Sequence, residues 1–122
     1  MADPVPTLGP LERQLMEILW DSDEELATRE VLNRTGQPLA YTTVATVLNN
    51  LTRKGLLEKV AAGRMWAYRP VIGRAAYTAD VMAGALATST NRSDSLLHFV
   101  GSIPEEDLAV LRALLDEDLS AP

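Results

Sequence analysis

An uncharged, hydrogen-bonding surface is the first feature of this sequence that could do chemistry. Apolar residues at i, i+3, i+4 and i+7 predict a helix over residues 42–54, capped by residue 41 or 42 and ended by Gly55. The face opposite that stripe has no acid and carries Thr42, Thr46, Asn49 and Arg53, with Thr43 and Asn50 on its flanks. Short donors and acceptors of this kind suit base edges in a DNA major groove, where Thr meets the thymine methyl and Asn pairs with adenine. The alternative is an ordinary solvated helix face.

Positive charge is concentrated just beyond that helix. The 122 residues include 11 Lys and Arg against 17 Asp and Glu, a net charge of −6. Residues 49–74 nevertheless hold six basic side chains and one acid, whereas residues 76–122 hold two basic side chains and eight acids. Such a local basic surface is typical of phosphate binding, although scattered solubilising charge is the alternative. We expect Arg53, Lys54 and Arg64 to meet phosphates.

Residue types for enzymatic or metal chemistry are scarce. The absence of cysteine excludes a disulfide framework, a thiolate metal site and thiol catalysis, and His98 is the single histidine. No nucleophile motif or Gly-rich phosphate loop is present. We therefore expect no catalytic residues, no metal and no cofactor. No stretch reads as a signal peptide or a membrane span, so we expect a cytoplasmic protein without membrane insertion.

The elements that position these residues follow the order helix, short helix, helix, hairpin. Gly9 and Pro10 open the first helix after a Pro-rich leader that contains Pro4 and Pro6, and Thr28 is the expected N-cap of a second helix over residues 29–34. After the third helix come two short strands, residues 56–61 and 65–69, with a turn over residues 62–64.

This order predicts a winged helix-turn-helix, which places its third helix in the major groove and its hairpin on the flanking backbone. Thr28 and Arg29 begin the second helix, whose backbone N–H groups would meet another phosphate, and Tyr41 begins the third. Trp66 and Tyr68 share one face of the hairpin, which we expect to pack on the core instead of stacking on bases.

Beyond the hairpin the pattern is purely helical. Helices are expected over residues 75–88 and 93–100, and the capping box Ser102 to Glu105 predicts a last one. Their apolar residues are Tyr77, Val81, Leu86, Leu96, Leu97, Phe99, Val100, Leu108, Leu111, Leu114 and Leu115. So short a segment is only marginally stable alone, so another surface must cover its apolar faces. Two-fold DNA half-sites favour a second copy of the chain, and not the winged helix, as that surface. We predict a DNA-binding domain over residues 1–74 and a helical dimerisation region over residues 75–122, a mainly α fold.

Particular runs of residues carry a family resemblance that covers residues 7 to about 116. They are Leu8-Gly9 through Glu12, Leu19-Trp20, Ala40-Tyr41-Thr42-Thr43-Val44, Thr46-Val47-Leu48, Leu51, Lys54-Gly55-Leu56, Arg64, Tyr68 and Pro70. With them the chain resembles the penicillinase-repressor (BlaI/MecI/CopY) family of transcriptional repressors.

The resemblance implies a homodimer on an inverted-repeat DNA operator that represses genes for β-lactamase, resistance or copper handling. Copper-responsive members have a Cys-rich tail, which this chain lacks. Several members are inactivated when a membrane-bound sensor protease triggers cleavage of an Asn-Phe bond, and the matching pair here is His98-Phe99.

Another class of function is a winged-helix module that binds proteins and has no DNA target. The acidic tail would suit a basic partner, but such a module has no need for basic residues concentrated on the third helix and hairpin. An enzyme ranks third.

Overall fold

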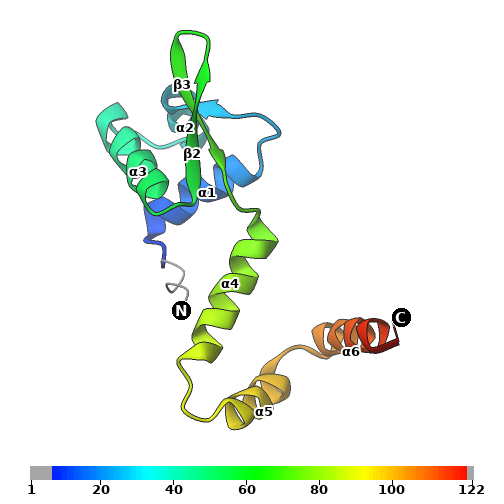
Figure 1. Cartoon of the computed structure of the whole chain (residues 1–122). Coiled ribbons are helices and arrows are strands. Elements are labelled where there is room, and N and C mark those ends of the chain that lie inside the picture. The colour runs from blue at the N-terminus through cyan, green and yellow to red at the C-terminus, as the bar shows by residue number, and fades with distance from the viewer. Residues whose placement is uncertain (1–6, 121–122) are drawn as a thin grey trace. The chain divides into compact units, whose positions relative to one another are not determined.

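The computed structural model describes residues 7–120, so the leader with Pro4 and Pro6 lies outside the described residues. Along the chain the elements are α1 (Pro10–Trp20), β1 (Leu26–Ala27), α2 (Thr28–Thr35), α3 (Tyr41–Arg53), β2 (Leu57–Ala62), β3 (Met65–Pro70), α4 (Arg74–Ala87), α5 (Arg92–Ser102) and α6 (Glu105–Ser120) (Figure 1). The chain divides into two compact units between Met82 and Ala83. The first is a winged helix-turn-helix, and the second is helical, so the predicted fold class is confirmed.

The core of the first unit is built from one apolar stripe on each of its three opening helices. Leu15, Met16 and Leu19 of α1, Val31 of α2, and Val44, Leu48 and Leu51 of α3 are each at most 1% exposed. Full burial of one such side chain contributes about 1.5 to 3 kcal/mol. The predicted stripe of α3 is therefore the face that packs inward, with Val47 at its edge.

The beginnings of α2 and α3 differ from the prediction by one residue. The N-caps are Ala27 and Ala40, both extended, and neither Thr28 nor Tyr41 nor Thr42 is a cap. In α2 the capping group is Glu30, whose Oε1 accepts a hydrogen bond from the Ala27 N–H at 3.1 Å. Thr28 is instead a buried residue of the first turn.

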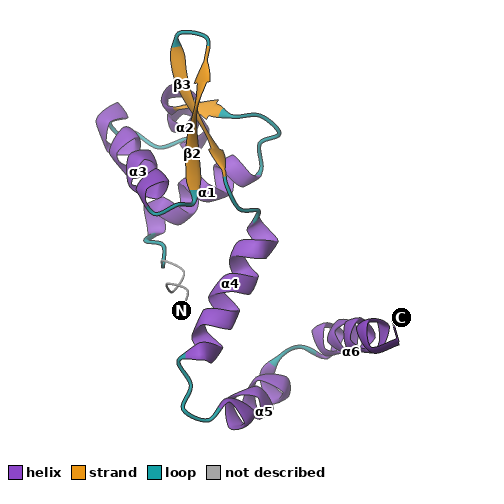
Figure 2. Ribbon diagram, viewed as in Figure 1, coloured by secondary structure: helices purple, strands orange, loops and turns teal. Residues whose placement is uncertain are grey.

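The sheet contains one strand that the sequence did not predict. β2 and β3 form the hairpin, and β1 pairs with the other edge of β3, Leu26 opposite Tyr68 and Ala27 opposite Ala67 (Figure 2). The turn has two residues, not three: Gly63 has φ +66° and Arg64 has no positive φ. This pattern is typical of a type II′ turn, in which glycine takes the first central position.

The two aromatic residues of β3 have different environments. Tyr68 is buried and Trp66 is 57% exposed, so the prediction of a buried pair was right for Tyr68 and wrong for Trp66. The register explains the difference. Tyr68 pairs with β1 on one side and β2 on the other, whereas Trp66 lies past the end of β1, where only β2 flanks it.

Side chains of α1 hold the beginning of α4. Trp20 Nε1 donates to the Ile72 carbonyl at 2.9 Å, and Arg74 bonds Glu17 at 2.6 Å and Asp21 at 2.8 Å. The Tyr77 ring lies 5.5 Å from the Trp20 ring and is 4% exposed. Tyr77, predicted for the dimer face, therefore packs in the core of its own winged-helix unit.

The second unit has two helices that bury little. Asn91 caps α5 by accepting from the Asp94 N–H at 3.0 Å, and no residue of α5 is buried. Ser102 does not cap α6: its hydroxyl donates to the carbonyls of His98 and Phe99, both at 3.0 Å, and so ends α5. No helix within residues 7–120 is long and apolar enough to cross a bilayer.

Candidate nucleic-acid interface

The outer face of α3 presents the predicted hydroxyl and amide groups to solvent. The core stripe holds one side of the helix against α1 and α2, which leaves the opposite side open. On that side the exposed residues are Tyr41, Thr42, Thr43, Thr46, Asn49 and Arg53, and Asn50 is half-buried. No side chain caps the N-terminus of α3, and its first turn contains no acid. The structure thus brings the predicted base-reading set together on one acid-free face.

A cation–π contact joins the beginnings of α2 and α3. The Arg29 guanidinium carbon lies 5.1 Å from the centre of the Tyr41 ring, which is 45% exposed. The Arg29 guanidinium therefore adds a cation beside the N-terminus of α2, where Glu30 accepts from the Ala27 N–H. Thr28 contributes no exposed side chain.

Three basic residues of the predicted positive stretch are paired with acids of the same chain. Lys54 Nζ bonds both carboxylate oxygens of Glu12, at 2.7 and 2.9 Å. Arg69 pairs with Glu58, and Arg74 pairs with Glu17 of α1 and with Asp21 just after that helix. The hydrogen bond from Lys54, helped by one from the Gly9 N–H, holds the pKa of Glu12 below its ordinary value. Lys54 therefore ties the end of α3 to the beginning of α1.

The other three basic residues have no acid partner among residues 7–117, whose side chains the structure describes. They are Arg53 at the end of α3, Arg64 in the hairpin turn and Lys59 on β2. An unpaired arginine retains its full charge for a phosphate, which makes Arg53 and Arg64 the stronger candidates from the predicted set.

Lys59 and Trp66 are surface residues of the hairpin that the sequence analysis did not assign to the interface. Lys59 pairs directly with Tyr68 across the strands, and its ammonium lies 5.5 Å from the Trp66 ring centre and 5.8 Å from that of Tyr68. A two-residue turn at Gly63–Arg64 would have indicated this register and placed Lys59, Trp66 and Tyr68 on one face.

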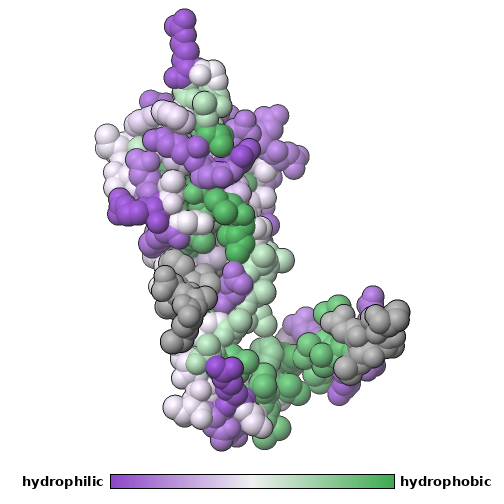
Figure 3. Space-filling model, in the orientation of Figure 1, coloured by the Kyte–Doolittle hydropathy of each residue, from purple (hydrophilic) through white to green (hydrophobic). Residues whose placement is uncertain are grey.

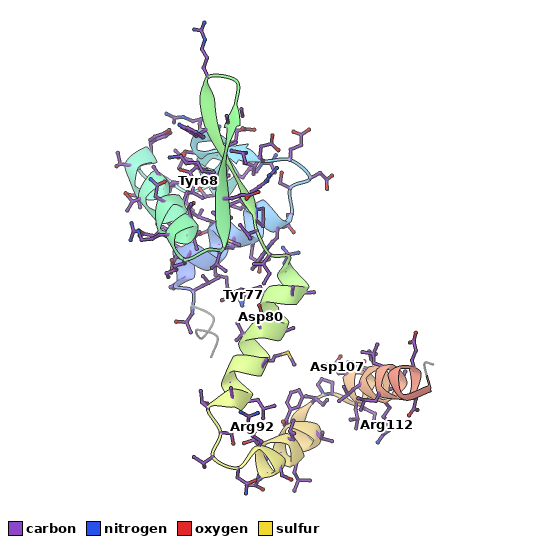
Figure 4. The ribbon with its side chains drawn as sticks, viewed as in Figure 1. Tyr68, Tyr77, Asp80, Arg92, Asp107 and Arg112 are labelled. Carbon is purple, nitrogen blue, oxygen red and sulfur yellow. The ribbon has the colours of Figure 1, made fainter. Side chains whose placement is uncertain are left out.

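One hydrogen bond joins the hairpin to the exposed face of α3. The Tyr68 hydroxyl donates to Asn49 Oδ1 at 3.0 Å, so a buried ring of β3 reaches a predicted base-reading side chain. Figure 4 shows Tyr68 where the hairpin passes beside α3. No pattern in the sequence indicated this contact.

The second unit presents its predicted dimerisation residues on the surface. Leu97 is 70% exposed, Leu114 53%, Leu115 52%, Leu96 46%, and Phe99 and Val100 39% each. Figure 3 shows apolar side chains gathered over α5 and α6. Leu86, Leu108 and Leu111 are half-buried, and Val81 of α4 is 39% exposed.

The predicted cleavage pair lies inside α5. His98 is exposed, and its Nε2 lies 3.7 Å from Asp94 Oδ1, too far for a hydrogen bond. No group of His, Asp and Glu side chains in the described part of the chain is arranged to hold a metal ion.

Comparison with known proteins gives one family and one fold. The family model of the penicillinase repressor matches residues 8–117. The transcriptional regulator BlaI of two strains of Mycobacterium tuberculosis is 38% identical over 115 residues, which cover 90% of this chain and 83% of that protein.

Two solved structures are also similar. One is the solution structure of the monomeric form of Bacillus licheniformis BlaI with the blaP half-operator, 27% identical with a TM-score of 0.50, covering 60% of this chain and 90% of that one. The other is the regulator PcaV of Streptomyces coelicolor with its natural ligand, 21% identical with a TM-score of 0.51, covering 93% of this chain and 76% of that one. The likeness to PcaV shows the fold alone.

Proposed function

This chain belongs to the penicillinase repressor family of transcriptional repressors, which are not enzymes, and we propose that it binds a specific DNA operator as a homodimer. The observation that carries the proposal is the face of α3: hydroxyl and amide groups without an acid, with unpaired arginines at the end of the helix and at the hairpin turn. The half-operator bound to Bacillus licheniformis BlaI supports DNA as the partner.

In the proposed complex α3 enters the major groove. Thr42, Thr43, Thr46 and Asn49 then read base edges, and Asn50 contributes from the flank. Arg53 at the end of the helix, Arg64 at the hairpin turn and Arg29 on the ring of Tyr41 meet phosphates and set the register. Lys54 contributes less to phosphate binding, because the carboxylate of Glu12 already compensates its charge.

The proposed dimer forms through the second unit. The 40 residues of this unit bury too little of their apolar side chains for a stable fold. Segments of that size are only marginally stable without a disulfide, a metal or a partner. A second copy supplies that cover and matches the two-fold symmetry of an inverted-repeat operator. Two linked heads then bind with a high effective concentration that one head lacks.

Membership of the family favours a finer proposal. The protein regulates genes for β-lactamase or other resistance in the cytoplasm, and a sensor protease triggers its release from DNA. The candidate bond, His98–Phe99, lies in the middle of α5, so a protease reaches it only when that short helix opens. Cleavage there would separate most of the second unit from the DNA-binding heads and end the gain from linkage.

The experiment is a titration of the whole chain with the DNA upstream of its own gene and with random DNA of equal length. Sequence-specific binding predicts at least about a thousandfold preference for the operator. Asn49→Ala should reduce that preference, and the matched variant Asn33→Ala, an exposed amide of α2, should not. Equal affinity for both DNAs would contradict the proposal, and a dimer that binds no DNA would favour the protein-binding alternative.

A further inference from the structure

The amide of Asn49 has one end occupied within its own chain. Its Oδ1 accepts from the Tyr68 hydroxyl at 3.0 Å, and Tyr68 is 3% exposed. A carboxamide has one acceptor end and one donor end, which point in different directions. Since Oδ1 faces β3, the NH2 group points away from the hairpin, and no partner within residues 7–117 occupies it.

This occupancy matters because the two ends of an asparagine read different bases. Bidentate pairing with adenine uses both ends, the oxygen accepting from N6 and the NH2 group donating to N7. Guanine presents only acceptors, N7 and O6, on the same edge of the major groove. Because the Tyr68 hydroxyl turns Oδ1 toward β3, the amide presents only its NH2 group to the groove, which can satisfy guanine but makes half of its pairing with adenine.

We propose that Tyr68 is a positioning residue that turns Asn49 into a donor-only reader, which selects guanine over adenine in each operator half-site. The inference rests on the proposed function and deepens it, because it names the base and the residue that sets the choice. Tyr68 touches no DNA itself: its ring is core, and its hydroxyl is the polar contact between β3 and this amide.

The geometry of the hairpin keeps the contact in place. Tyr68 pairs with Leu26 on one side and Lys59 on the other, so its backbone is held by strands on both edges. Asn49 follows directly on Leu48, which is fully buried against the core. Both ends of the hydrogen bond therefore stand on rigid elements, as an accurate reading side chain requires.

The test measures affinities for every single-base-pair variant of one operator half-site. Asn49→Ala first identifies the base pair whose preference depends on Asn49. At that pair the unaltered chain should prefer guanine to adenine by about tenfold, within the range of one bidentate contact. Replacing that guanine with 7-deazaguanine, which lacks the N7 acceptor, should weaken binding by the unaltered chain and leave Asn49→Ala unaffected.

Tyr68→Phe keeps the ring and removes the hydroxyl. The released amide can rotate and pair with adenine, so the preference for guanine should fall to about threefold or less, or reverse. Asn33→Ala, which removes an exposed amide of α2 outside the proposed interface, should leave the preference unchanged. Asn49→Asp keeps an acceptor for Tyr68 and turns an oxygen to the DNA, so it should shift the preference toward cytosine, whose N4 is a donor, even if Tyr68→Phe folds poorly.

The outcomes separate this inference from the function on which it rests. If the unaltered chain shows no preference at any base pair, the proposed function fails. If the preference exists but is for adenine at the Asn49-dependent pair, or is the same in Tyr68→Phe as in the unaltered chain, the function stands and the positioning role of Tyr68 is overturned.

Discussion

Arg64 offers the sharpest test of how the hairpin contributes to DNA binding. It occupies the second position of the turn after Gly63, is exposed, and has no acid partner within residues 7–117. In the proposed dimer two such arginines, one from each copy, each neutralise one phosphate. Arg64→Ala should therefore weaken binding to operator and random DNA by the same factor, because a phosphate contact carries no sequence information.

The expected size of the effect follows from the release of counterions. Each neutralised phosphate contributes about −0.9 to the slope of log affinity against log salt concentration. Two contacts contribute about −1.8, so between about 50 and 200 mM salt they account for roughly a twelvefold loss of affinity. The variant should lack this part of the salt dependence.

Anisotropy titrations on operator and random DNA across that range of salt measure the slope directly. Arg64→Lys keeps the charge and should retain the slope of the unaltered chain. The double variant Glu58→Gln, Arg69→Gln removes the neighbouring ion pair of the hairpin without changing the net charge, so it should also retain it. A slope for Arg64→Ala equal to that of the unaltered chain, or a loss confined to the operator, would refute the reasoning.

Three further predictions concern stability, base reading and assembly. Because Lys54 lowers the pKa of Glu12 below its ordinary 4.5, the ion pair stabilises the fold above that pH, and this stabilisation is lost as the pH falls through the lower folded value. Glu12→Gln should therefore lower the free energy of unfolding by about 0.5 to 1 kcal/mol at pH 7 and change it little at pH 2, as thermal unfolding would show. Asn49→Ala should keep the fold, at a cost of about 0.5 to 1.5 kcal/mol for the lost hydrogen bond from Tyr68, and should weaken operator binding by about 1 to 3 kcal/mol in mobility shifts. An unchanged ratio of operator to random affinity would exclude Asn49 as a base reader. Leu97→Asp places a charge on a side chain that is 70% exposed and should yield a folded monomer in sedimentation, and a persistent dimer would exclude Leu97 from the interface.

The helices of the first unit could be predicted from the sequence because their pattern is local. A helix buries residues three and four apart, so the stripe with Val44, Leu48 and Leu51 is visible without any knowledge of its neighbours. The hairpin was equally visible through Gly63. β1 was not, because its two residues, Leu26 and Ala27, form a strand only by pairing with β3 about forty residues later.

The exposed face of α3 was also predicted, but its internal contacts were not. The pair Lys54 and Glu12 joins residues 42 positions apart, and the bond from Tyr68 to Asn49 spans 19. Side chains at such separations meet only through tertiary packing, which has no periodicity in the chain. The same reason explains Tyr77: its apolar spacing resembled that of the tail, yet the turn before α4 brings its ring to Trp20.

The most direct test of the central claim is a footprint of the purified full-length chain on the DNA upstream of its own gene. A dimeric winged-helix repressor predicts two protected half-sites related by two-fold symmetry, with centres about one helical turn or a multiple of it apart. Asn49→Ala should lose this protection at a protein concentration where Asn33→Ala retains it. A footprint without symmetry, or no protection at concentrations that coat random DNA, would contradict the account.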